Sequence, residues 1–178
     1  RLAQFDDRAS MLAFRFWPGP LTLVLPLQPD APVAKAVTAG LPTIALRCPA
    51  HPVMQAVLRQ SGLFLAAPSA NLSGGISPTR AEHVARSFGE AMPLVLDAGP
   101  CAAGLESTIV AVRDNGWQLL RPGPVTADEI AQLLGEPPLP VTEARIEAPG
   151  QLASHYAPSK PVRLNVTEAA SDEWHIGY

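Results

Sequence analysis

The chain has 178 residues, which suits one domain, or one domain with part of a second. Apolar residues make up 47% and charged residues 16%, which excludes a disordered segment. No apolar run approaches the roughly 20 residues that cross a bilayer, and a net charge of −3 argues against a global attraction to nucleic acid. We therefore expect a soluble, cytoplasmic protein with a packed core.

Short apolar runs alternate with helical patterns along the chain. Residues 1–15 have the apolar spacing of an amphipathic helix, which the sequence WPGP then ends. Twenty prolines and thirteen glycines indicate short elements joined by firm turns. The runs predicted as strands are residues 21–26, 42–46, 63–67, 93–96, 107–112 and 117–120.

Three further helices have readable boundaries. His51-Pro52 begins one that ends near Gly62. Residues 79–82 and 126–129 both read T-x-x-E, the capping-box pattern of a helix start. Strands alternating with helices of this length predict a layered α/β domain with a mixed sheet.

The carboxy-terminal part of the chain differs from the rest. The alternating pattern dissolves after about residue 136. We expect a catalytic domain over residues 1–144, a linker over 145–160 and the start of a second α/β domain over 161–178.

Familiar metal and nucleotide motifs do not occur in the sequence. Cys48 and Cys101 lack CxxC spacing and the four histidines are scattered, so we predict reduced, core-packed thiols and no zinc site. There is no GxxxxGK[ST], GxGxxG, HExxH or GxSxG. A nucleotide would have to bind without a Walker loop.

Polar residues gather in residues 66–79, AAPSANLSGGISPT. The small residues let the main chain approach a ligand, and Ser69, Asn71, Ser73 and Ser77 offer hydroxyl and amide groups. A turn that makes only local hydrogen bonds explains the same composition. Both interpretations stay open from spacing alone.

Two arginines end predicted strands. Arg47 ends PTIALR and Arg121 ends WQLLR, and a guanidinium there can grip a carboxylate or phosphate. The alternative for each is a strand-end salt bridge, although two arginines in matching positions favour an anionic ligand. Ser107 begins another run beside Glu106, and Tyr156 lies in the predicted linker. Each of these last three residues also has a purely structural interpretation: Ser107 in a turn, Glu106 in an ion pair, and Tyr156 as an anchor of the linker.

Taken together, these segments resemble one family. PTIALRCPAHP, APSANLSGGISPT, LDAGPCAAGLESTIV and LLRPG, in this order, are similar to the threonylcarbamoyl-AMP synthases of the YrdC-like fold. PGQLASHYAPSKPV resembles the linker of the longer, two-domain form. The resemblance implies a twisted mixed sheet with flanking helices around a concave ligand cavity.

The resemblance also implies a reaction. The family joins L-threonine, bicarbonate and ATP, the last with Mg²⁺, into threonylcarbamoyl-adenylate and pyrophosphate. Downstream transfer proteins then modify adenosine 37 of transfer RNAs. This would make the protein a nucleotidyltransferase of tRNA processing, with no membrane partner and no protein ligands assigned to a metal.

Site residues follow from the match to the family's motifs, although no catalytic residue is assigned. On the ATP side the resemblance implies Thr43, Ser69, Asn71, Ser77, Arg121 and Tyr156. On the threonine side it implies Arg47, the backbone of Ala67, and Ser107. The family's amino-terminal portion, with a lysine and an arginine for the triphosphate, has no counterpart before Arg1. We therefore expect a chain truncated at both ends that lacks several ligands.

Two other functions are compatible with this fold. A carbamoyl-adenylate-forming domain of hydrogenase maturation factors shares the fold, but those proteins lack the HYAP linker. A non-catalytic RNA-binding module would use the concave surface, but a net charge of −3 and the lack of interleaved aromatic and basic residues argue against it.

Overall fold

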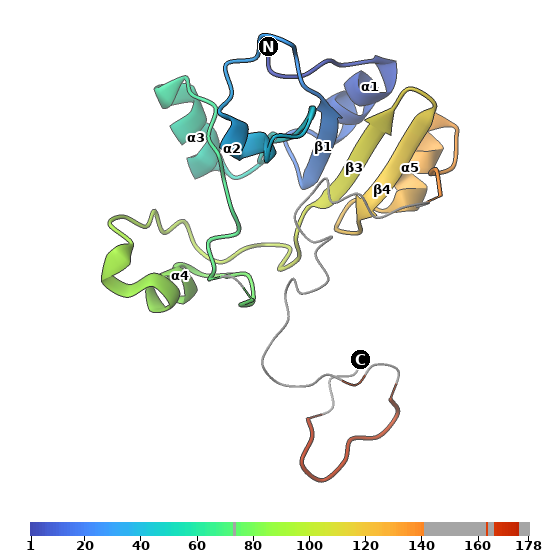
Figure 1. Cartoon of the computed structure of the whole chain (residues 1–178). Helices are drawn as coiled ribbons and strands as arrows, with labels where there is room; N and C mark the ends of the chain where they lie inside the picture. The colour runs from blue at the N-terminus through green and yellow to red at the C-terminus, as the bar shows by residue number, and fades with distance from the viewer. Residues whose placement is uncertain (73, 141–162, 164–165, 175–178) are drawn as a thin grey trace.

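The computed structural model describes residues 1–72, 74–140, 163 and 166–174 (Figure 1). One sheet with helices packed beside it forms the larger part, and a segment containing α4 extends away from that sheet. The elements in chain order are α1 (Asp7–Phe16), β1 (Leu21–Pro26), α2 (Lys35–Thr38), β2 (Thr43–Arg47), α3 (Pro52–Ser61), α4 (Ala81–Phe88), a 3-10 turn (Gly89–Ala91), β3 (Thr108–Arg113), β4 (Gly116–Arg121) and α5 (Ala127–Leu134).

The four strands form a mixed sheet in the order β2-β1-β3-β4. The pair β1–β2 is antiparallel, β1–β3 is parallel, and β3–β4 is an antiparallel hairpin. The parallel strands β1 and β3 are neighbours in the sheet, although α2, β2, α3 and α4 lie between them in the chain. The predicted α/β class with a mixed sheet and flanking helices is confirmed.

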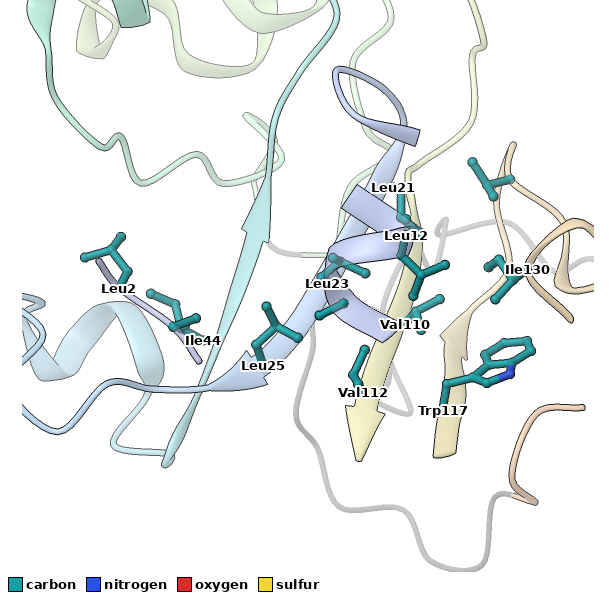
Figure 2. Close-up of a cluster of buried hydrophobic side chains, with 13 residues drawn as sticks. Leu2, Leu12, Leu21, Leu23, Leu25, Ile44, Val110, Val112, Trp117 and Ile130 are labelled. Carbon is teal, nitrogen blue, oxygen red and sulfur yellow. The ribbon is translucent and has the colours of Figure 1, made fainter. Parts of the chain in front are cut away.

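The first face of the sheet carries the main core. Apolar side chains from all four strands pack there against α1 and α5, as Figure 2 shows. Trp117 on β4 is fully buried, and its indole Nε1 donates to the Glu136 carbonyl oxygen at 3.1 Å. Arg8 on α1 also joins the end of α5, with 2.6 Å between its Nε and Glu136 Oε1. The two helices are thereby fixed to each other and to the sheet.

A smaller apolar cluster lies on the second face, opposite α1 and α5. It contains Val24, Ile109 and Ala111, with Leu120 packed against them. Side chains alternate along a strand, so Thr22 and Ser107, two positions before Val24 and Ile109, point to this same face.

Two of the predicted helix starts are confirmed. Helix α3 begins at Pro52 and ends at Ser61, followed by the C-cap Gly62, whose φ of 65° is left-handed. Helix α5 has the complete capping box of Thr126 and Glu129. The backbone N–H and the hydroxyl of Thr126 both donate to the Glu129 carboxylate. These hydrogen bonds, the backbone one most of all, lower the pKa of Glu129.

Two other helix boundaries differ from the prediction. Helix α1 begins at Asp7 rather than residue 1, because the Asp6 carboxylate accepts from the Ala9 N–H at 2.8 Å and caps it there. The capping box at residues 79–82 is wrong. The N-cap of α4 is Arg80, so Thr79 lies one residue before the capping position. Arg80 itself makes no side-chain capping bond.

The predicted strands at residues 63–67 and 93–96 are also wrong. Both segments lie outside every ladder of the described chain, and their apolar side chains face solvent, with Phe64 69% and Leu94 71% exposed. A strand requires a hydrogen-bonded neighbour, and none lies beside these runs among the described residues. Their composition is that of strands, but the pairing is missing.

The remaining structural predictions have mixed outcomes. Cys48 and Cys101 are both free thiols as predicted, but Cys48 is half-buried and Cys101 is exposed, so neither is core-packed. The predicted linker, residues 145–160, lies outside the described residues, and the division into two domains stays a prediction. Among the described helices, none is long and apolar enough to span a membrane.

Candidate ligand-binding site

The strand registers bring the two predicted arginines onto one line across the sheet. Arg47 pairs with Thr22, Thr22 with Ile109, and Ile109 with Arg121. Side chains of directly paired residues point to the same face. The β3–β4 ladder has a register irregularity at Ile109/Val110, and there the contact of Arg121 with Ser107 Oγ places the guanidinium on this face. We call these four residues the cross-strand row. It lies on the second face of the sheet, with a guanidinium at each end and three inter-strand spacings of about 4.8 Å each between them.

Arg121 is held firmly at its end of the row. Its Nε and Nη2 donate to the Ser107 carbonyl oxygen at 3.0 and 2.8 Å, and Nη2 lies 3.1 Å from Ser107 Oγ. Nη2 also lies 3.6 Å from Glu106 Oε2. The strand-end ion pair considered as an alternative is therefore present, and it orients a group that has five N–H donors.

Ser107 connects this arginine to the middle of the row. The residue is 4% exposed, and its hydroxyl oxygen lies 2.8 Å from Thr22 Oγ1. The next residue fixes the strand: Thr108 Oγ1 donates to the Val125 carbonyl oxygen at 2.6 Å and accepts from the Val125 N–H at 3.0 Å. Ser107 thus sits on a rigid strand end.

The turn after Arg121 packs directly against the start of β3. A Cβ at Gly123 would lie 2.4 Å from Thr108 N and 2.6 Å from the Glu106 carbonyl oxygen. A side chain has no room there, so glycine is required for this approach. The sequence RPG after β4 therefore has a packing role beside the polar cluster.

Thr43 stands on the same side of β2 as Arg47, because the two residues are four positions apart along the strand. It pairs with Pro26 and lines a hollow of about 630 Å³ together with Arg113, Gln118 and Leu139. Neither Arg47 nor Arg121 lines this hollow.

The loop at residues 66–79 is the second polar group. Asn71 Nδ2 donates to the carbonyl oxygens of Leu72 and Gly75 at 2.9 and 3.0 Å, as the turn interpretation requires. However, Asn71 Oδ1 and Ser77 Oγ are buried and have no hydrogen-bond partner within the described part of the chain. Such atoms are costly without a partner, so a local turn alone does not account for them.

The other predicted site residues are separate. Ser69 is exposed and lines a second hollow, of about 280 Å³, with Thr79, Arg80 and Asp97. Ala67 is exposed in the segment that precedes it. Tyr156 and Ser73 lie outside the described residues. Across the described ranges, no group of three His, Cys, Asp or Glu side chains is placed to hold a metal ion.

Sequence reasoning missed Thr22. One polar residue in the apolar run LTLVL resembles an ordinary strand residue, and its place beside Ser107 depends on the parallel pairing of β1 and β3. One signal in the sequence could have indicated its face: Thr22 lies two positions from Val24, so both side chains point to the second face.

The fold and the row together define an α/β domain that presents fixed cationic and hydroxyl groups on one sheet face, as anion-binding domains do. Residues 1–123 match the Sua5–YciO–YrdC family model, described as "Telomere recombination". Residues 125–176 match a model described as "Threonylcarbamoyl-AMP synthase, C-terminal domain". The chain belongs to the Sua5–YciO–YrdC family, which confirms the resemblance.

Two curated relatives carry the same name. A threonylcarbamoyl-AMP synthase of Bacillus subtilis (strain 168) is 44% identical over 164 residues, covering 89% of this chain and 46% of the relative. One from Pyrococcus abyssi (strain GE5 / Orsay) is 42% identical, covering 89% of this chain and 48% of the relative. The chain therefore spans about half the length of these curated relatives.

Solved structures agree with the fold. P. abyssi Sua5 complexed with L-threonine superposes with a TM-score of 0.81 at 41% identity, covering 89% of this chain and 48% of that one. E. coli YciO, at a TM-score of 0.53 and 18% identity over 72% of this chain and 62% of that one, is similar in fold alone.

Proposed function

We propose that this chain forms part of an L-threonylcarbamoyladenylate synthase. The enzyme would make threonylcarbamoyl-AMP and pyrophosphate from L-threonine, bicarbonate and ATP, for modification of position 37 in transfer RNA. The observation that carries the proposal is the cross-strand row, on a fold that the chain shares with an L-threonine-bound Sua5.

The proposed chemistry requires positioning more than covalent help. The amine of threonine combines with bicarbonate to give a carbamate and water. A carbamate oxygen then attacks the α-phosphorus of ATP, a new P–O bond forms, and the bond to pyrophosphate breaks. Because carboxylate, carbamate and triphosphate are all anions, guanidinium and hydroxyl donors lower the barrier by holding these groups together and compensating their charge.

On the threonine side, we assign the amino acid to Arg47, Ser107 and the backbone of Ala67. Arg47 is exposed at the end of β2, so its guanidinium is accessible to a carboxylate. Ser107 is a rigid hydroxyl at the start of β3. Guanidinium, hydroxyl and backbone N–H donors together suit a small anionic ligand whose orientation must be defined.

On the nucleotide side, we assign ATP to Arg121 and to the polar residues of the loop. The orphaned Asn71 Oδ1 and Ser77 Oγ support this, since a bound nucleotide would supply the missing partners. An amide oxygen accepts a hydrogen bond, which suits a ribose hydroxyl or a base amino group. The full proposed set is Thr43, Ser69, Asn71, Ser77, Arg121 and Tyr156.

Mg²⁺ enters this proposal through the triphosphate alone. The described residues provide no cluster of metal ligands, and Mg²⁺ commonly binds phosphate oxygens and water with few protein ligands. Transfer of the product to RNA by downstream proteins, and a cytoplasmic location, belong to the same proposal.

The deciding experiment is pyrophosphate release by the full-length protein, with threonine and bicarbonate omitted in turn. Release should require both, and mass spectrometry should detect threonylcarbamoyl-AMP. Release that ignores threonine would overturn the substrate assignment. Salt-dependent RNA binding without ATP turnover would favour the RNA-binding alternative.

A further inference from the structure

Thr22 occupies the middle of the cross-strand row, and none of the roles assigned above uses it. It is half-buried on β1, between Arg47 on one neighbouring strand and Ile109 on the other. Its Oγ1 lies 2.8 Å from Ser107 Oγ, and either hydroxyl can be the donor. Thr22, which has no assigned ligand, therefore contacts Ser107, which is assigned to L-threonine.

The hydrogen-bond capacity of Ser107 Oγ limits what this contact can do. A hydroxyl has one proton to donate and two lone pairs that accept. Arg121 Nη2, which can only donate, lies 3.1 Å from Ser107 Oγ and takes one lone pair. When Thr22 donates as well, both lone pairs are filled, and the Ser107 proton must point to a third group.

We propose that Thr22 is a positioning residue that sets the direction of the Ser107 O–H bond, so that Ser107 donates to a carboxylate oxygen of L-threonine. The inference rests on the proposed function. Thr22 then donates to Ser107 Oγ, and this hydrogen bond polarises and strengthens the one from Ser107 to the carboxylate. Because Ser107 is buried, water competes little for its proton.

Three variants of the full-length protein test this inference. Thr22→Val keeps the shape and removes the hydroxyl, whereas Thr22→Ser keeps the hydroxyl. Thr38→Val is the control, because it is the same substitution at a buried threonine whose hydroxyl donates to the Lys35 carbonyl oxygen within α2, away from the row. Calorimetry would measure L-threonine binding without ATP or bicarbonate, and binding of a non-hydrolysable ATP analogue without threonine.

We expect Thr22→Val to raise the Kd for L-threonine about three- to tenfold, the range of one net hydrogen bond. Thr22→Ser and Thr38→Val should bind L-threonine like the wild type, and the Kd for the ATP analogue should change less than twofold. A purely structural role would weaken both ligands together and lower Tm. Unchanged L-threonine binding by Thr22→Val would overturn the inference.

A double-mutant cycle with Ser107→Ala shows whether Thr22 acts through Ser107. If it does, Thr22→Val adds no further loss of L-threonine binding when Ser107 is already alanine. Additive losses would overturn the inference. Absence of L-threonine binding by the wild type would instead overturn the proposed function, so the two failures are distinguishable.

Discussion

The candidate site combines two regions that the fold supports differently. The sheet region places its polar side chains on strands whose other face covers the main core. In the loop region, residues 62–106, no described residue is buried. The sheet region holds Thr22, Thr43, Arg47, Ser107 and Arg121. The loop region holds Ala67, Ser69, Asn71 and Ser77.

This difference indicates how each region positions a ligand. The sheet region is fixed by ladders and by packing, and hydrogen bonds join Arg121 to Ser107 and Ser107 to Thr22. The loop region has orphaned polar atoms and large exposed apolar side chains, and regions with few buried contacts open at low free energy. We infer that the sheet region is preorganised and that ligand contacts add to the order of the loop region.

The largest contrast should come from large-to-small substitutions in the two regions. Trp117→Ala removes a fully buried side chain and should lower the free energy of unfolding by about 3–5 kcal/mol. Phe64→Ala removes a ring that is 69% exposed and should change it by less than about 0.5 kcal/mol. Urea unfolding measures both. Equal losses would mean that the loop region packs as tightly as the sheet region.

Gly123→Ala tests the close approach beside the polar cluster. The new Cβ would clash with backbone at Glu106 and Thr108, and this should cost about 1–3 kcal/mol of stability or more. Because Ser107 lies between these two residues, pyrophosphate release should fall as well. Pro122→Ala, at the exposed neighbouring position, is the control that should retain both stability and activity. A normal Gly123→Ala protein would show that the turn can move without cost.

Alanine at the two ends of the cross-strand row should separate the substrates. Arg121→Ala should weaken ATP use and, by leaving the Ser107 carbonyl oxygen without its donors, lower stability by about 1–3 kcal/mol. Arg47→Ala should weaken threonine use and leave stability unchanged, because Arg47 is exposed. KM values for each substrate and urea unfolding check this. Equal losses for both substrates in both variants would contradict the division.

Sequence patterns predicted the sheet region far better than the loop region. The runs at 21–26 and 107–112 form strands because they pair with each other in the sheet. The run at 63–67 has similar composition, but composition does not reveal whether a neighbouring strand is present. Arg47 and Arg121 were predicted as matching strand ends, whereas their common row and the role of Thr22 depend on registers, which no local pattern specifies.

The smallest expected effect compares two T-x-x-E sequences, one in each region. Hydrogen bonds from Thr126 lower the pKa of Glu129, so the charged carboxylate stabilises the fold at neutral pH, and this contribution is lost as the pH falls below the usual glutamate pKa of about 4.3. Glu129→Gln should therefore lower Tm slightly at pH 7, and the difference from the wild type should shrink toward pH 3. Glu82→Gln should leave Tm unchanged, because α4 has no side-chain cap. A matching, pH-dependent loss at Glu82 would show that the second capping box forms after all, and that the loop region is ordered by the same local bonds as the sheet region.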